Sequence, residues 1–401
     1  MAEAVTKGDR FELRVARLLF WEGAFVRRAI NLNMHFGEEF TVTDVDILAL
    51  RFTRDLAVST SIGECKATEA KSAPKATDRL LWGGGLRTLV GANDNFVVTT
   101  RAASERVRRL ARQLGSDLLD EHDVAHREAV LHLDDRSSWG PFDPELLVRQ
   151  RAAHDAVKDD RDLKRVYWFT RSDFWFLQPV AGIKRALGAC RVLAGRWAPE
   201  LPTAERDAVR WLAAQIVVTA IVALVRIAAT SYRQPPRVTR ARLAEQLAEG
   251  LADHRTLTEL SREVDRLVMA VLRDAGVDPG RTIGALGALR PAPPGYADSL
   301  IDVVERLAGE PAAAAELPRL ADWRIAEHQL AHGLGALPAA TVEVLDGHTD
   351  RLLRTVVAFL KGHGRLPSEL VDGLLRPSGD EREVRATVPP VGGGEAAPAE
   401  R

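Results

Sequence analysis

The stretch IGECKAT places a carboxylate and an ammonium group two positions apart, at Glu64 and Lys66, among small and β-branched neighbours. A second pair of acids, Asp44 and Asp46, lies earlier in TVTDVDILAL. Residues i and i+2 of a strand share one face of a sheet, so each pair points to one side, while Cys65 faces away from its two neighbours. Pairing of the two segments as a hairpin would bring all four charged groups together.

A cluster of carboxylates among apolar residues calls for a cation, because like charges repel and burial disfavours the charged form. Mg²⁺ suits such a cluster, since it prefers carboxylates, water and phosphate oxygens and needs no histidine. A bound metal ion would also lower the pKa of its water. The simpler alternative is an exposed Glu64–Lys66 strand pair, which would contribute under about 1 kcal/mol.

The elements that position these residues follow from hydrophobic periodicity. GDRFELRVARLLFWEG predicts an amphipathic helix, and the segments 41–50 and 56–67 predict a hairpin around the turn RFTRD. NDNFVVTT at 93–100 predicts a strand, ASERVRRLARQLG a helix, and Leu118–Leu119 a short final strand. Residues 1–133 are therefore expected to form an α/β domain with a mixed sheet flanked by helices.

The character of the chain changes after this region. Residues 134–160 carry the turn residues and charge runs of a linker that is helical in part. Residues 161–376 show helical periodicity with abundant Ala, Leu and Arg, which predicts an all-α accessory domain. Its aromatic start, YWFTRSDFWFLQP, suits a core or an interface, with base stacking as the alternative. Residues 377–401 lack apolar periodicity and are predicted to be a disordered tail.

Composition limits the classes of protein to which the chain can belong. Of its 401 residues 46% are apolar and 28% charged, and the net charge of −1 means that any nucleic-acid surface must be local. The two cysteines, Cys65 and Cys190, indicate no disulfide framework, and the N-terminus shows no secretory signal pattern. The uncharged run at 211–225 is short of the roughly 20 residues that cross a bilayer. We expect a cytoplasmic protein with no membrane partner, and a buried core helix at 211–225.

The ordered set of motifs resembles the PD-(D/E)xK nuclease superfamily. A helix with a glutamate, a strand with DVDIL and a strand with ECK are followed by FVVTT, RRLARQLG and DLLDEHDV, an order most similar to Mrr-type restriction endonucleases. The resemblance covers residues 8–125 and implies a restriction-endonuclease-like fold there. The chain lacks the proline that commonly precedes the aspartate, a departure that the superfamily tolerates.

Carried onto this chain, the resemblance implies a catalytic set of four side chains: Asp46, Glu64, Lys66 and Glu12. Asp46 and Glu64 would bind the metal ion, with the backbone carbonyl of Cys65 as a third ligand and Glu12 completing the metal shell. Lys66 would orient or activate the attacking water. The alternative for Glu12 is the solvent-exposed face of its helix.

Asp44 is the alternative to Asp46 as the metal ligand. We prefer Asp46 because the apolar run of the strand follows it directly. Four basic residues that follow the ECK motif are interleaved with small residues, as expected where a protein follows a nucleic-acid backbone: Lys71, Lys75, Arg79 and Arg87. A helix with a solvated basic face is the equal alternative. The glycine run at 83–85 lacks the Lys-Ser/Thr of a nucleotide-binding loop, so we interpret it as a hinge.

Together these features predict an endonuclease that uses Mg²⁺, or Mn²⁺, to hydrolyse phosphodiester bonds in DNA, with RNA left open. The resemblance implies a role in restriction or anti-phage defence, and as partners a second copy of the chain or a defence-system protein. The helical domain would serve recognition, oligomerisation or regulation. Two alternatives stay open: a non-catalytic module that holds nucleic acid or a partner protein, and a nuclease that cuts only with a partner or signal.

Overall fold

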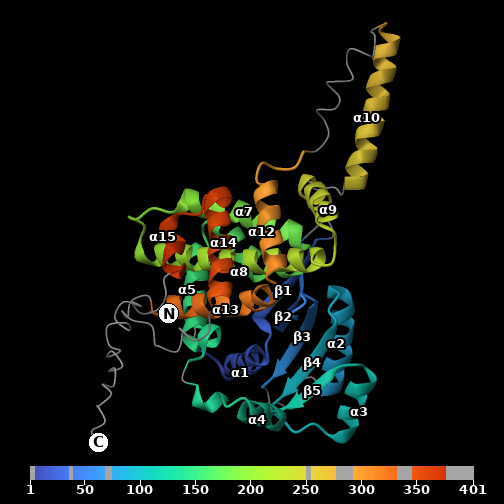
Figure 1. Cartoon of the computed structure of the whole chain (residues 1–401). Coiled ribbons are helices and arrows are strands. Elements are labelled where there is room, and N and C mark those ends of the chain that lie inside the picture. The colour runs from blue at the N-terminus through green and yellow to red at the C-terminus, as the bar shows by residue number, and fades with distance from the viewer. Residues whose placement is uncertain are drawn as a thin grey trace, which may run out of the picture.

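A mixed sheet of five strands forms one part of the molecule, and a group of helices forms the other (Figure 1). The computed structural model describes the residue ranges 5–35, 39–67, 75–136, 138–249, 254–276, 292–331 and 346–375. The predicted mixed sheet with flanking helices is confirmed, as is the helical character of the C-terminal part. The restriction-endonuclease-like assignment of the sheet stays a prediction.

The strands follow one another across the sheet in chain order. The first three form an antiparallel meander, and each of the last two runs parallel to the strand before it. The predicted hairpin corresponds to the second and third strands, whose β-branched residues favour the pleated conformation. The strands are β1 (Phe25–His35), β2 (Glu39–Phe52), β3 (Val58–Lys66), β4 (Asp94–Thr99) and β5 (Asp117–Asp120).

Strand β1 was missing from the sequence prediction. Its segment FVRRAINLNMH interrupts the apolar alternation with arginines and asparagines, which hides the strand pattern. The two arginines find partners outside the strand: Arg27 pairs with Asp322 of the helical part, and Arg28 pairs with Glu12 of the first helix. Ion pairs with distant residues therefore neutralise two arginines that the local sequence pattern would place on the surface.

Helices cover both faces of the sheet. Helix α1, which begins at a capping box made by Thr6 and Asp9, packs its apolar face against Cys65 and Val98. On the opposite face, α2 and α3 pack around Val97. The helices of this part are α1 (Lys7–Trp21), α2 (Ala76–Val90), α3 (Glu105–Gln113) and α4 (Glu121–Val130).

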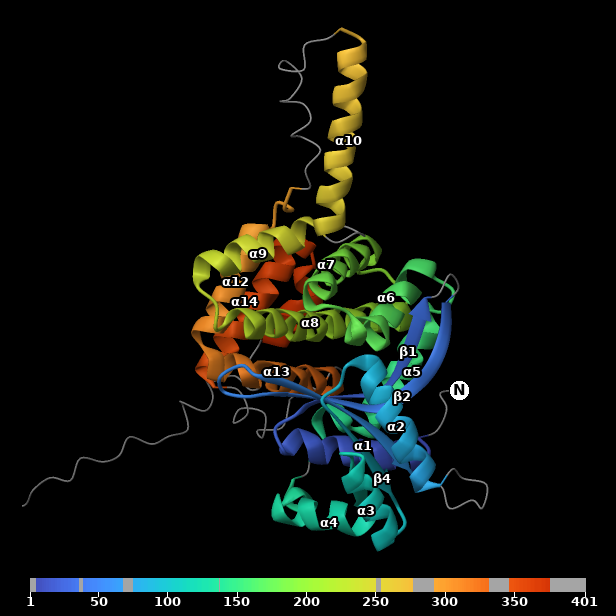
Figure 2. The ribbon, with the colours of Figure 1, turned by 90° about the vertical axis from the view of Figure 1, so that its right-hand side faces the viewer.

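Helix α8 (Thr203–Ser231) runs through the middle of the helical part, and the other helices pack around it (Figure 2). Within the described ranges it is the one helix that is long and apolar enough to cross a membrane. However, 83% of its most apolar segment is buried inside the protein. A helix that is apolar on all sides fits a protein interior. The predicted buried helix at 211–225 is confirmed.

The remaining helices complete this part, and α10 extends away from the body (Figure 2). They are α5 (Pro144–Val157), α6 (Arg161–Arg171), α7 (Pro179–Arg196), α9 (Pro236–Ala248), α10 (His254–Asp274), α12 (Ala297–Gly309), α13 (Pro311–Ala331), α14 (Gly347–Gly364) and α15 (Ser368–Val371), with short 3₁₀ turns at Leu133–Asp135, Gly140–Phe142, Asp173–Phe176 and Asp372–Leu375.

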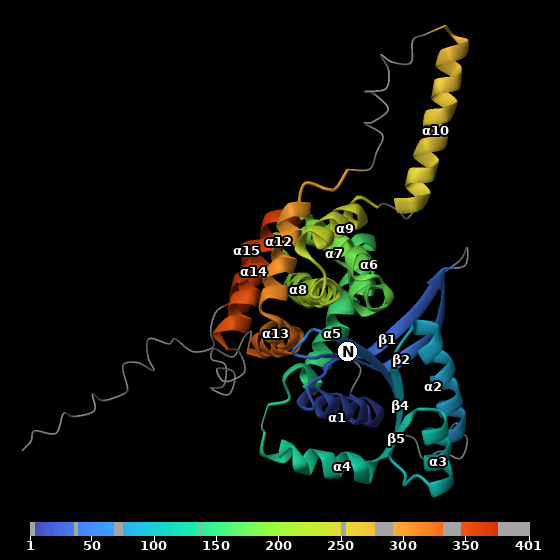
Figure 3. The same cartoon turned by 45° about the vertical axis from the view of Figure 1, so that its right-hand side comes forward.

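Hydrophobic clusters join the sheet to the helices, and α6 and α13 lie beside β1 (Figure 3). Phe25 of β1 stacks on Trp175, with 5.8 Å between ring centroids, and Phe20 of α1 stacks on Trp323 of α13 at 5.0 Å. The segment 134–160, predicted as a linker, contains α5, whose buried face includes Val157. It is packed into the molecule and is not a spacer. The predicted tail at 377–401 lies outside the described residues.

Candidate active site

Asp46 and Glu64 lie side by side where β2 and β3 separate. The last residue pair of the ladder between the two strands is Ile47–Gly63, and the next residue on each strand is one of the two acids. The backbone N–H of Cys65 donates a hydrogen bond of 2.7 Å to Oδ2 of Asp46. The carboxylate thus replaces the backbone acceptor that the ladder would have supplied. Both acids are buried, with 9% and 5% of their surface exposed.

Close packing explains why position 63, directly before Glu64, is a glycine. A Cβ atom at this position would lie 2.1 Å from Cζ of Phe96, which is its neighbour across the parallel β3–β4 ladder. Any side chain would therefore displace the Phe96 ring. The glycine lets β4 pack directly beside the two acids.

Two cationic side chains reach Glu64. Nζ of Lys66 contacts Oε1 of Glu64 and lies 3.7 Å from Oδ2 of Asp46, so it bridges the two carboxylates. Arg79 of α2 approaches the same Oε1 atom to 3.0 Å through Nη1. Arg79 was predicted to contact a nucleic-acid backbone, and the structure places it on a predicted metal ligand. Sequence spacing gave no sign of this contact, because it joins two elements that only the fold brings together.

Glu12 lies at the edge of this cluster. Its Oε2 atom accepts a hydrogen bond of 2.6 Å from Nη2 of Arg28, and its side chain is 20% exposed. Burial raises the pKa of Glu12, and the neighbouring Arg28 guanidinium opposes that rise. The charge of Glu12 in turn helps to raise the pKa of Asp46, so the two carboxylates interact through space. Glu12 is thus a partly buried, ion-paired side chain, and its role as a metal ligand stays a prediction.

The other predicted residues separate into different environments. Asp44 is exposed, which agrees with the preference for Asp46. Lys75 is exposed at the N-cap of α2, and Nη1 of Arg87 donates to the carbonyl of Gly115 at 3.1 Å, a contact that ties α2 to the turn before β5. Lys71 lies outside the described residues. The glycines at 83–85 are inside α2, so the predicted hinge is wrong.

The thiol of Cys65 packs against α1, on the side of β3 opposite Glu64. Burial raises its pKa well above the ordinary value, so this cysteine stays a neutral thiol. Only its backbone carbonyl remains a candidate ligand.

The donor set fits a hydrated divalent ion. Among the described residues, no group of three or more His, Cys, Asp or Glu side chains is arranged to enclose a metal ion. Mg²⁺ is commonly held by one or two carboxylates and keeps several waters, so a magnesium site at Asp46 and Glu64 would not require a third acid. A cation would also relieve the repulsion between them.

The protonation of Asp46 reflects that repulsion. Burial, and next the charge of Glu64, raise the pKa of Asp46 from 3.8 to about 7, although the Cys65 N–H and Lys66 act in the opposite direction. The metal-free folded protein therefore holds a proton that the unfolded chain releases. The contribution of this group to the free energy of unfolding is therefore largest below the ordinary pKa of 3.8 and is lost as pH rises through about 7.

We predict that Asp46→Asn removes this pH dependence. Between pH 5 and 8 the wild-type protein in EDTA should lose on the order of 2 kcal/mol of stability through this group. The amide can still accept the Cys65 N–H but does not titrate. Urea unfolding of both proteins at several pH values measures the difference. Equal slopes in the two proteins would show that Asp46 is not the titrating group.

The comparisons with protein-family models, with curated proteins and with solved structures find no match for this chain.

Proposed function

We propose that this protein is a metal-dependent endonuclease that hydrolyses phosphodiester bonds in DNA. The observation that carries the proposal is the buried pair Asp46 and Glu64, with Lys66 placed between the two carboxylates. Burying two acids side by side is unfavourable unless a cation accompanies them. The resemblance to PD-(D/E)xK nucleases adds restriction or anti-phage defence in the cytoplasm as the setting.

Each side chain of the site has a role in this reaction. Asp46, Glu64 and the carbonyl of Cys65 would hold Mg²⁺ or Mn²⁺, and Glu12 would support them from the edge of the site. When bound, the ion supplies a water of lowered pKa and neutralises charge on the scissile phosphate. The Lys66 ammonium lies where it can orient that water and stabilise the negative charge that develops on the phosphate oxygens. Arg79 can neutralise a neighbouring phosphate once it leaves Glu64.

Incubation of the full-length protein with supercoiled plasmid tests the proposal. We expect nicked or linear DNA with Mg²⁺ or Mn²⁺ and intact plasmid with EDTA, while single-stranded DNA and RNA in parallel reactions define the substrate class. Intact substrates under every divalent ion, together with retained DNA binding, would instead support a non-catalytic binding module. The full chain is required because β1 packs into the core shared with the helices.

A second candidate is a nuclease held inactive until a partner protein, a second copy of the chain or a signal engages it. The observation in its favour is that Lys66 and Arg79 both contact the same oxygen of Glu64, which occupies a proposed metal ligand. In the plasmid assay, Arg79→Ala should then cut faster than the wild-type protein. Slower cutting would assign Arg79 to substrate binding and contradict this second candidate.

A further inference from the structure

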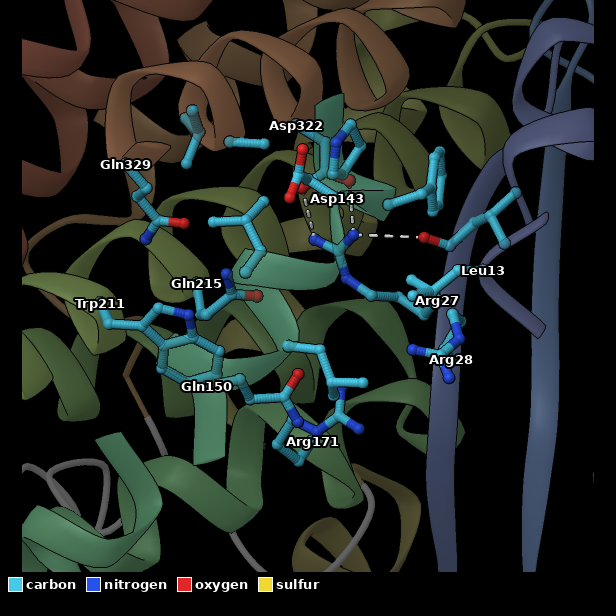
Figure 4. A pocket seen from close by; sticks show the side chains of 17 residues that line it. Leu13, Arg27, Arg28, Asp143, Gln150, Arg171, Trp211, Gln215, Asp322 and Gln329 are labelled. Atoms are coloured by element: carbon cyan, nitrogen blue, oxygen red, sulfur yellow. Dashed lines mark hydrogen bonds and ion pairs between the residues drawn. The ribbon is translucent and has the colours of Figure 1, made fainter. Parts of the chain in front are cut away.

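A polar cavity lies at the junction of the sheet and the helices (Figure 4). It has a volume of about 80 Å³ and opens between β1, α5, α6, α8 and α13. Apolar side chains form part of its wall, and the polar side chains that line it carry guanidinium, amide and carboxylate groups: Arg27, Arg28, Asp143, Gln150, Arg171, Gln215, Asp322 and Gln329. The cavity lies between β1 and the helical part, and none of the proposed catalytic side chains lines it.

The three arginines of the cavity differ in their partners. Arg27 makes two hydrogen bonds to Asp322, at 2.5 and 2.8 Å, and Arg28 pairs with Glu12. Arg171 donates to the carbonyl of Ala29 at 2.8 Å and to the side-chain oxygen of Gln150 at 3.0 and 3.2 Å, and it is hydrogen-bonded to Tyr167. All these partners are uncharged, and within the described ranges no carboxylate forms an ion pair with Arg171.

Arg171 is under electrostatic strain. Part of its surface remains accessible, yet protein atoms surround the guanidinium closely enough that desolvation, together with repulsion from Arg28 and Arg27, lowers its pKa to about 10. The group is still protonated at neutral pH. An anion beside it would relieve both costs.

Two donors at the cavity have no hydrogen-bond partner in the described part of the chain. They are Nε of Arg28, whose side chain is only 10% exposed, and Nε2 of Gln329. A buried donor without an acceptor is unfavourable, and such groups point to an acceptor from outside the protein. A ligand rich in acceptor oxygens would satisfy both donors, and a negative charge on it would also pair with Arg171.

We propose that this cavity binds a phosphate group. Guanidinium groups match the oxygens of phosphate in geometry and charge, and amides supply further donors. A second hollow of about 550 Å³ adjoins it, since Trp211 and Gln329 line both. The phosphate is therefore either inorganic phosphate or part of an organic monoester whose remainder extends past Trp211.

Calorimetric titration of the metal-free protein at constant ionic strength tests the site. The probes are inorganic phosphate, a nucleoside monophosphate and the same nucleoside without phosphate. We expect the two phosphates to bind and the nucleoside not to bind, with tighter binding of the monoester if the second hollow is used. Because no DNA or metal ion is present, the result is independent of the proposed nuclease activity.

Arg171→Gln should weaken phosphate binding at least about tenfold, because a charge-assisted contact is lost. Arg161→Gln, at a side chain that is 85% exposed, is the matched control and should bind as the wild-type protein does. Equal affinity in Arg171→Gln and wild type would overturn the proposal.

Gln215→Glu is a second variant, which keeps the test valid if Arg171→Gln fails to fold. This change adds a carboxylate of nearly the same shape to the cavity, as a counter-charge for Arg171. It should raise the melting temperature of the ligand-free protein and reduce phosphate binding at least about tenfold. A lower melting temperature with unchanged phosphate binding would show that the cavity does not need an anion.

Discussion

Lys66→Ala should reduce metal-dependent cleavage by about 10²- to 10³-fold, the usual effect of removing one group that stabilises transition-state charge. Lys66 is the cation between Asp46 and Glu64, and its side chain keeps 27% of its surface exposed, so it can reach both the carboxylates and a bound phosphate. Arg79 continues to neutralise Glu64 in the variant. We therefore expect a change of less than about 2 kcal/mol in the free energy of unfolding.

The measurement is the rate of plasmid nicking with Mg²⁺, accompanied by circular dichroism and a DNA-binding assay. Lys158→Ala is the matched control, because this lysine is exposed at the end of α5, has no predicted role in the site and belongs to no ion pair in the described structure. It should cut at close to the wild-type rate. Loss of activity in both variants would point to general loss of DNA binding, and full activity of Lys66→Ala would remove Lys66 from the mechanism.

The local part of the candidate site was predictable from the sequence. Alternation along a strand placed Glu64 with Lys66, and hairpin pairing placed Asp46 next to them. These relations depend only on the two-residue period of a strand and on a short turn between neighbouring strands. The choice of Asp46 over Asp44 also followed, because the apolar run of β2 begins beside Asp46.

The remaining contacts were not predictable because they join segments distant in the sequence. Arg79 reaches Glu64 only because α2 packs against the sheet, and Arg27 pairs with Asp322, which lies 295 positions later in the chain. Strand β1 and the burial of helix α5 were not predictable for the same reason. Their polar residues or turn signals suggested exposure, whereas the fold buries them with partners that periodicity does not show.

Asp322→Ala should lower the free energy of unfolding by about 3–5 kcal/mol, the usual effect of removing one partner from a buried ion pair. The side chains of Arg27 and Asp322 are only 10% and 6% exposed, and the Arg27 guanidinium lies 4.5 Å above the Phe25 ring. The variant leaves this charge buried in the shared core. Because that core joins the sheet to the helices, both parts should lose stability in a single unfolding transition.

Urea unfolding followed by far-UV circular dichroism and by tryptophan fluorescence measures this effect. Arg233→Ala is the control, since its pair with Asp55 is exposed and should contribute little. The double variant Arg27→Met, Asp322→Leu should recover most of the lost stability, because apolar residues of similar volume often replace a buried ion pair well. Two separate transitions, or a loss as small as that of the control, would show that the sheet and the helices fold independently and that this ion pair does not join them.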